Sequence, residues 1–267
     1  MLENRGVMYY CTRYLISLVP CFRKCCLRVY FDFAFSSIFS LEMAFSKMFV
    51  DSSLHIEFYE NVFETPANLF QRLEEEVVYM PAENCKVIVR GKEYAVSRQI
   101  AAYGDDNMSY RFSGLTVNCQ PWTPLFLEIK NHVENITGAR YNFVLVNRYK
   151  DGTSYIGQHK DNEPDLEQEQ PIASVSFGQN RTMIFKRPKH ADQQVELKDN
   201  SLLVMRPPTN LLWTHGISAE KQKTGVRLNL TFRRMKTEKP TQEEKIEKTL
   251  KRKADDDDDD EIGRAHV

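Results

Sequence analysis

The amino-acid sequence predicts an α+β domain in which helices pack on a β-sandwich or barrel. Apolar residues repeat at helical spacing in two segments of the first half of the chain. After Gly138 the pattern changes to short β-branched or aromatic runs separated by turn residues. Two helices followed by many short strands argue against a βαβ sheet, in which helices and strands alternate.

Each predicted helix begins at a Thr-Pro pair, at residues 65–66 and 123–124, because proline fits the first turn of a helix. The apolar positions are Leu69, Phe70, Leu73 and Val77 in the first helix and Leu125, Phe126, Ile129 and Val133 in the second. The predicted strands span residues 141–149, 172–177, 182–186, 195–198, 202–205 and 226–233. Both helices precede the strands, so we expect them to support one face of the β-structure.

Composition gives few constraints on function. The 267 residues have a formal net charge of -1, which does not by itself indicate a nucleic-acid-binding protein. Without residues 251–267, which hold seven acids and four bases, 32 basic and 30 acidic residues remain, so the body is weakly basic. The six cysteines show no repeated zinc-ligand spacing, and we expect a reducing intracellular compartment. No apolar run is long enough to predict a membrane span.

We expect one folded domain over residues 54–236. Residues 1–53 form a poorly defined N-terminal segment, interpreted either as a targeting peptide or as translated upstream sequence with the start at Met43 or Met48. Residues 237–267 are expected to be a charged, disordered tail, and its basic cluster at 245–253 fits a nuclear import signal. The last seven residues, 261–267, match the translation of a common sequencing adapter and are interpreted as an assembly artefact.

The first chemical signal is His159-Lys160-Asp161. In extended structure the outer two side chains lie on one face, about 6–7 Å apart, and can bind one ion. His215, which follows Trp213 in a predicted loop, is the best third candidate. Two histidines and one carboxylate leave coordination positions open, which suits iron(II). A His-x-Asp pair alone is a weak signal, because such pairs more often lie in surface turns.

The second signal is strict alternation over residues 226–233. The apolar positions are Val226, Leu228, Leu230 and Phe232, and the polar positions are Arg227, Asn229, Thr231 and Arg233. An edge strand with a solvated polar face is the alternative interpretation. Guanidinium groups, however, bind carboxylates in a bidentate manner, and 2-oxoglutarate has a carboxylate at each end. If the polar face points into a barrel, it predicts a cosubstrate pocket.

The chain resembles the AlkB family of iron(II)- and 2-oxoglutarate-dependent dioxygenases that dealkylate nucleic acids. The resemblance is carried by His159-x-Asp161, His215 and Arg227-x5-Arg233, and it covers about residues 58–235. It is closest to the AlkB homologue two branch, which repairs double-stranded DNA. The family implies a double-stranded β-helix (jelly-roll, cupin-like) core, N-terminal supporting helices and a nucleotide-recognition lid at about residues 85–115.

The resemblance also implies roles for individual residues. The iron ligands, and thus the catalytic residues, are His159, Asp161 and His215. The 2-oxoglutarate-binding residues are Asn147, Tyr149, Arg227, Asn229, Thr231 and Arg233. The substrate-binding residues are Arg90, Gly91, Lys92, Tyr110, Arg111, Phe112 and Asn162. The implied reaction uses O2 to demethylate 1-methyladenine or 3-methylcytosine in DNA, with release of formaldehyde and succinate, after the base has left the stack.

Two positions depart from that branch. Arg90 replaces an aromatic finger that enters the duplex, and Glu220 lies where the branch has basic residues that hold the opposite strand. Glu220 is expected to repel phosphate, so single-stranded DNA or RNA is an alternative substrate. A non-catalytic nucleic-acid-binding module and a hydrolytic zinc site are further alternatives, and the arginine-bearing strand argues against both. We expect a nuclear monomer, or a mitochondrial protein if residues 1–48 are a targeting peptide.

Overall fold

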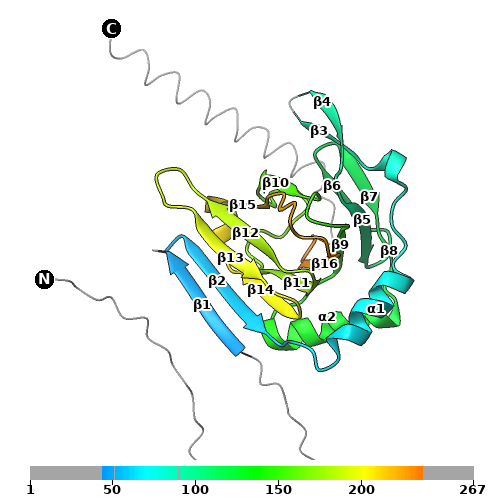
Figure 1. The fold of residues 1–267 in the computed structure, drawn as a ribbon, viewed down its shortest axis with the longest axis horizontal. Coiled ribbons are helices and arrows are strands. Elements are labelled where there is room, and N and C mark those ends of the chain that lie inside the picture. Colours follow the sequence, from blue (N-terminus) through cyan, green and yellow to red (C-terminus); the bar gives the residue numbers. More distant parts are fainter. Residues whose placement is uncertain (1–43, 51, 90, 237–267) are drawn as a thin grey trace, which may run out of the picture. The chain divides into compact units, whose positions relative to one another are not determined.

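The computed structural model describes residues 44–50, 52–89 and 91–236 (Figure 1). The predictions for residues 1–43, for the tail at 237–267 and for Arg90 lie outside these residues. Within the described part, no helix is both long and apolar enough to cross a lipid bilayer.

A large mixed sheet forms the centre of the described domain. Its strands, in spatial order, are β1 (Ala44–Val50), β2 (Leu54–Glu60), β14 (Ser201–Met205), β11 (Ile172–Gly178), β16 (Arg227–Arg233), β9 (Phe143–Tyr149), β5 (Gln99–Gly104) and β8 (Gln120–Pro121). Neighbouring strands are antiparallel except for β5 and β8, which are parallel. β1 pairs with β2 along its whole length, so the sheet starts ahead of residue 54, where we expected the folded domain to begin.

A smaller antiparallel sheet faces the large one. It contains β10 (Ile156–His159), β15 (Thr214–Ile217), β12 (Arg181–Lys186) and β13 (Gln193–Leu197). Phe185 and Leu197 of the small sheet share a buried apolar cluster with Phe143 and Leu203 of the large sheet. The two facing sheets confirm the predicted jelly-roll core.

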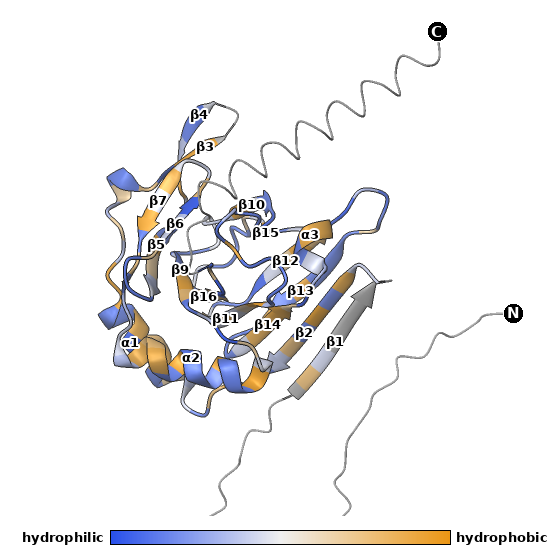
Figure 2. Cartoon of the chain, turned by 180° about the vertical axis from the view of Figure 1, so that it is seen from behind, coloured by the Kyte–Doolittle hydropathy of each residue, from blue (hydrophilic) through white to orange (hydrophobic). Residues whose placement is uncertain are grey.

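Two helices cover the outer face of the large sheet, α1 (Pro66–Glu76) and α2 (Pro124–Thr137), as Figure 2 shows from behind. α2 begins where Thr123 Oγ1 accepts a hydrogen bond from Phe126 N, at 3.4 Å, and ends at Gly138 with φ +70°. Its apolar side packs with that of α1 in one buried cluster with strand residues such as Val175 and Leu230. Both predicted helices are confirmed, with two differences in the first: Phe70 is only partly buried, and Val77, although buried, lies after the end of α1.

β16 lies in the middle of the large sheet, between β11 and β9. Leu228, Leu230 and Phe232 point toward the helices and belong to their apolar cluster. The alternate side chains, Arg227, Asn229, Thr231 and Arg233, are 1–7% exposed. The low exposure of these side chains excludes a solvated edge strand and places the polar face of β16 inside the protein.

Two hairpins extend beyond the sandwich within the range predicted to form the lid. They are β3 (Lys86–Val89) with β4 (Lys92–Ala95), and β6 (Ser109–Phe112) with β7 (Leu115–Asn118). Ile88 N donates to Ser113 O at 2.7 Å and thereby joins the hairpins. β5 lies between them in sequence but belongs to the large sheet. The remaining short elements are the 3-10 turn Ala82–Asn84 and α3 (Thr209–Leu212).

Candidate active site

The three predicted metal ligands meet at one end of the small sheet. β10 and β15 are antiparallel, and His159 lies directly opposite His215, with ring centroids 4.4 Å apart. Asp161 follows β10 by two residues, and its Oδ1 lies 3.6 Å from His159 Nε2. One potential ligand atom from each residue lies within 4.8 Å of the others. His215 lies on β15, so its prediction in a loop was wrong. The connection after the strand at 202–205 contains α3 and ends before His215.

Both histidine rings are arranged as metal ligands. His159 Nδ1 is 2.9 Å from the Gly157 carbonyl oxygen, which can only accept, so Nδ1 is the donor and Nε2 is the nitrogen that faces Asp161 and a metal ion. Burial, together with nearby His159, lowers the pKa of His215 to about 3. His215 is therefore neutral at physiological pH, and its Nδ1 is buried without a hydrogen-bond partner in the described structure.

Asp161 is held as a carboxylate by Arg233. Burial alone would raise the pKa of Asp161, but the positive charge of Arg233 and its hydrogen bonds to the carboxylate outweigh burial and lower the pKa to about 2. Arg233 donates to Oδ2 from Nε at 3.0 Å and from Nη2 at 2.7 Å. Oδ1 is left on the side of His159. Asn210 Oδ1 accepts a hydrogen bond from Asp161 N, which fixes the backbone at this point.

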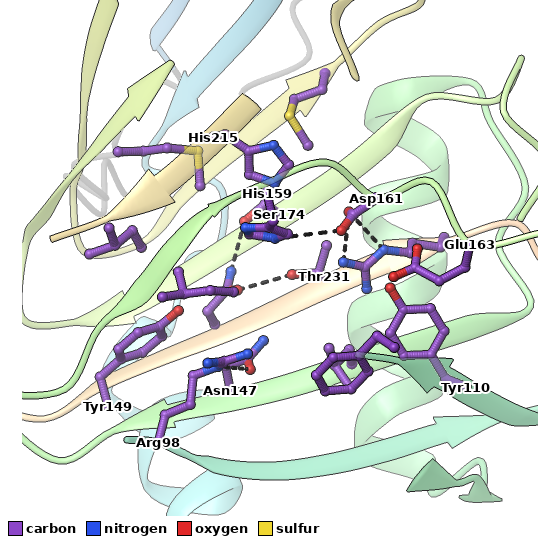
Figure 3. Close-up of a pocket in the computed structure, with 18 residues that line it drawn as sticks. Arg98, Tyr110, Asn147, Tyr149, His159, Asp161, Glu163, Ser174, His215 and Thr231 are labelled. Carbon is purple, nitrogen blue, oxygen red and sulfur yellow. Dashed lines mark hydrogen bonds and ion pairs between the residues drawn. The ribbon is translucent and has the colours of Figure 1, made fainter. Parts of the chain in front are cut away.

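A cavity next to the three ligands lies between the two sheets (Figure 3). Five of the six predicted cosubstrate residues line it, namely Asn147, Tyr149, Asn229, Thr231 and Arg233. Asn229 Nδ2 donates to Ser174 Oγ at 2.7 Å, and Thr231 Oγ1 donates to Asn229 Oδ1 at 3.0 Å. These bonds fix the polar face of β16 before any ligand binds.

Arg227, the sixth, lies behind the cavity wall. Its guanidinium carbon is 5.0 Å from the centroid of the Tyr149 ring, and Nη2 donates to Ser176 Oγ at 2.9 Å. Nε and Nη1 are buried and have no hydrogen-bond partner among the described residues. Burial lowers the pKa of Arg227 to about 10, so the side chain stays charged at neutral pH. A buried cation with unpaired donors fits a site for an anionic ligand.

Sequence reasoning missed several residues that line the cavity. Arg98 precedes β5 and donates from Nε to Asn147 Oδ1 at 2.6 Å. Glu163 lies beside the Tyr110 hydroxyl, and burial together with the charge of Asp161 raises its pKa. The spacing His159-x-Asp161-x-Glu163 is a signal that could have identified the glutamate. Arg98 has no such local pattern.

A wider groove of about 770 Å³ opens onto the cavity. Arg98, Phe112, His159 and Glu163 line both spaces, so the groove leads to a metal ligand. The predicted substrate residues are divided between several places. Arg111, Phe112 and Asn162 line the groove, Tyr110 lines the inner cavity, and Gly91 and Lys92 are exposed at the β3–β4 turn outside both.

Glu220 does not point into solvent as an isolated charge. Its Oε1 accepts hydrogen bonds from Arg181 Nε at 3.2 Å and from Thr182 N at 3.1 Å, and its side chain is 20% exposed. The buried guanidinium of Arg181 offsets the charge of the carboxylate, which argues against the expectation that Glu220 repels phosphate.

The ligand set and the unpaired arginine fit iron(II) and 2-oxoglutarate. Imidazole and carboxylate donors that occupy part of a coordination sphere are typical of iron(II) oxygenases. His159, Asp161 and His215 would hold the iron, and the cavity beside them would hold the cosubstrate. A hydrolytic zinc site would leave the buried arginines of β16 unexplained.

Comparisons with known proteins agree with this site. The chain matches the 2OG-Fe(II) oxygenase superfamily model over residues 57–233. It is 45% identical over 176 residues to "DNA oxidative demethylase ALKBH2" of Mus musculus, an alignment that covers 62% of this chain and 74% of the mouse protein. The Homo sapiens protein of the same name is 44% identical over 176 residues, with 62% and 67% covered.

A solved structure, that of OsALKBH1, shares the fold. Its TM-score is 0.50 at 15% identity, and the match covers 70% of this chain and 100% of that one. The chain belongs to the 2OG-Fe(II) oxygenase superfamily and, within it, to the AlkB family of iron(II)- and 2-oxoglutarate-dependent dioxygenases.

Proposed function

We propose that this chain is a DNA repair enzyme that oxidatively demethylates 1-methyladenine and 3-methylcytosine, preferably in double-stranded DNA. The observation that supports this most is the position of His159, which lines both the enclosed cavity and the 770 Å³ groove. A flipped base entering from the groove would bring its alkyl group to the metal centre, whereas the cosubstrate would occupy the cavity behind it. The relatives named as DNA oxidative demethylases support DNA as the substrate.

With O2 as the oxidant, bound iron(II) and 2-oxoglutarate would supply the chemistry that oxidises an N-methyl group to formaldehyde, while 2-oxoglutarate is converted to succinate and carbon dioxide. The residues of the chain position the reactants. Arg233 keeps Asp161 ionised and oriented. Arg227 supplies a buried positive charge for a cosubstrate carboxylate, and Asn147 and Tyr149 shape the same cavity.

Recognition of the base belongs to the entrance of the cavity. Phe112 offers an aromatic ring there for stacking, and Glu163 offers a buried Oε2 without a hydrogen-bond partner among the described residues. An amino group on the pairing edge of adenine or cytosine could donate to that oxygen. In this proposal the two hairpins, β3–β4 and β6–β7, form the lid over the base.

Duplex preference is supported by the inward position of Glu220, which removes one of the two departures that favoured single strands. The other departure, Arg90, supports single-stranded DNA or RNA as the second candidate substrate. An arginine can stack but must lose water to enter a duplex, unlike an apolar wedge.

The deciding experiment measures succinate and formaldehyde from 1-methyladenine oligonucleotides, single- and double-stranded, with and without iron(II) and 2-oxoglutarate. Turnover that needs both cofactors and is faster on the duplex is expected. Faster turnover on single strands would favour the second candidate. Absence of turnover on both, from protein shown to bind iron, would overturn the enzyme proposal in favour of another substrate or a binding module.

The cellular part of the proposal is a monomer that works in the nucleus, with the basic segment at residues 245–253 as its import signal. Light scattering of the purified chain tests the monomer. Imaging of tagged protein, with and without residues 245–253, tests the location. Retention in mitochondria would instead support a targeting role for the N-terminal segment.

A further inference from the structure

Arg181, the first residue of β12, connects two loops behind the cosubstrate cavity. It is 1% exposed. Nη1 donates to Asp151 O at 3.3 Å, and Nη2 donates to Ser154 O at 2.9 Å and to Ser218 O at 2.6 Å. Nε donates to the Glu220 carboxylate. Asp151 and Ser154 belong to the β9–β10 loop, whereas Ser218 and Glu220 belong to the β15–β16 loop.

Direct backbone contact also joins the two loops. Glu220 N donates to Gly152 O, and Gly152 N donates to Lys223 O, both at 2.7 Å. A Cβ at residue 152 would lie 1.8 Å from Glu220 O, so only glycine allows this approach. The loops are therefore held as one unit, with Arg181 and Glu220 as its side-chain connection.

Both loops lead into the active site. The β9–β10 loop runs from Tyr149 to the strand that ends at His159, and the β15–β16 loop runs from the His215 strand to Arg227. The Tyr149 ring centroid is 5.8 Å from the guanidinium carbon of Arg181 and 5.0 Å from that of Arg227. Displacement of Arg181 would therefore reach the cavity wall through Tyr149.

The two guanidinium groups near Tyr149 differ in their partners. Arg181 has the Glu220 carboxylate and several carbonyls, so its donors and its charge are satisfied. Arg227 has a serine hydroxyl on Nη2, and its other two nitrogens lack hydrogen-bond partners in the part of the chain that the structure describes. Arg227 is thus the cation whose charge is available to an anionic ligand, and Arg181 is the one that is fixed in the framework.

We propose that Arg181 and Glu220 are positioning residues for the cosubstrate, which hold Tyr149 and Arg227 in place from the two loops without touching the cosubstrate themselves. The proposal rests on the proposed role of Arg227 as the carboxylate anchor. It replaces the role first expected for Glu220, a negative charge that opposes DNA phosphates, and the two roles predict different results for the same substitutions.

Three variants test the proposal. Glu220→Ala removes the acceptor for Arg181 and Thr182 N, whereas Glu220→Gln keeps an oxygen acceptor but removes the charge. Glu134→Ala is the matched control, since Glu134 also joins a backbone N–H (Tyr141) to an arginine (Arg140), on α2 beyond the opposite face of the large sheet. One readout is the affinity of the Mn(II)-loaded protein for 2-oxoglutarate, measured by calorimetry without nucleic acid. The others are the Michaelis constants for the cosubstrate and for the oligonucleotide.

We expect Glu220→Ala to weaken cosubstrate binding and to raise the cosubstrate Michaelis constant, each about tenfold, with little change in kcat at saturation. Glu220→Gln should stay within about threefold of the wild type on both measures. The Michaelis constant for the oligonucleotide should not change, and Glu134→Ala should lose thermal stability without altering cosubstrate binding. If Glu220→Ala does not fold, Glu220→Asp serves instead, because it keeps the charge but withdraws the carboxylate from Arg181.

Unchanged cosubstrate affinity in folded Glu220→Ala or Glu220→Asp would overturn the proposal. A lower Michaelis constant for the oligonucleotide in both Glu220→Ala and Glu220→Gln, with normal cosubstrate binding, would restore the phosphate-repulsion role. Because the affinity is measured without DNA, a wild-type protein that binds 2-oxoglutarate but does not turn over methylated DNA would contradict the proposed substrate and leave this inference standing.

Discussion

At the scale of single residues, Asp161 acts both as a predicted metal ligand and as the counter-ion of Arg233. One carboxylate oxygen faces the histidines, and the other accepts both hydrogen bonds from buried Arg233. His159, in contrast, is a half-buried ligand whose side chain is 32% exposed. The same loss of a metal ligand should therefore have different costs in folding stability at the two positions.

We expect His159→Ala to abolish formaldehyde release while the free energy of unfolding changes little. Asp161→Ala should abolish it too, and should also cost about 3–5 kcal/mol because Arg233 is left as a buried, unpaired charge. Product assays and urea unfolding measure the two effects. Turnover in either variant would contradict the ligand assignment, and equal stability would contradict the role of Asp161 as counter-ion.

Arg227 should act on the cosubstrate alone. We expect Arg227→Ala to raise the cosubstrate Michaelis constant at least about tenfold, because a buried charge with unpaired donors is lost. The Michaelis constant for the oligonucleotide in the same variant is the internal control and should stay constant. Steady-state kinetics with each substrate varied in turn measure both Michaelis constants. An unchanged Michaelis constant for the cosubstrate would contradict the assignment of Arg227 to the cosubstrate site.

The sequence allowed prediction of residues that belong to a local pattern. His159 and Asp161 were identified by spacing, and the four polar residues of β16 by alternation. Arg98 and Arg181 were not, since each is a single arginine whose partners lie far away in sequence, at Asn147 and Glu220. The pairing of Glu220 could not be predicted for the same reason, because its partner Arg181 lies far away in sequence.

At the scale of elements, the helices and strands that could be predicted from the sequence are those with a long periodic pattern of apolar residues. α2 and β16 have strong periodic patterns that a buried apolar side imposes, and both were predicted. β3, β4, β6 and β7 are four-residue strands in two-stranded hairpins, and the apolar alternation in β6 and β7 spans only two periods, too short to distinguish a strand in the sequence. β15 was missed because its four residues include His215 and Gly216, and only pairing with β10 and β12 defines it as a strand.

The C-terminal end of α2 depends on a buried glutamate. Glu134 accepts hydrogen bonds from Tyr141 N and from Arg140, both at 2.8 Å, and forms an ion pair with Lys130. Burial alone would raise the pKa of Glu134, but these donors outweigh it and lower the pKa below its usual value. The ionised form is thus bound more favourably in the folded protein than in the unfolded chain.

We expect Glu134→Gln to lose about 1–2 kcal/mol of unfolding free energy at pH 7. A lowered folded-state pKa gives stability that is complete above the unfolded pKa of about 4.3 and is lost as the pH falls through the folded value. The difference between wild type and variant should therefore shrink below about pH 4. Urea unfolding at several pH values measures it, and a difference that does not depend on pH would show that the charge of Glu134 contributes nothing.

At the scale of the whole molecule, the sandwich brings together groups that are distant in the chain. Asn147 and Tyr149 come from β9, the arginines from β16, and the metal ligands from β10, from β15 and from the segment just after β10. The site therefore lies between the sheets, and ligands that bind there contact both. Binding should consequently stabilise the folded domain as one unit.

We expect Mn(II), a substitute for iron that avoids turnover, to raise the melting temperature when added together with 2-oxoglutarate. A ligand at about 100 times its Kd stabilises by about 2.7 kcal/mol, which corresponds to roughly 5–10 °C for a domain of this size. Differential scanning fluorimetry measures the shift. Removal of the metal with a chelator should reverse the rise in melting temperature, and the His159→Ala variant should show only a small rise. An equal shift from 2-oxoglutarate without metal would mean that the cosubstrate binds independently of His159, Asp161 and His215, and would contradict a shared site between the sheets.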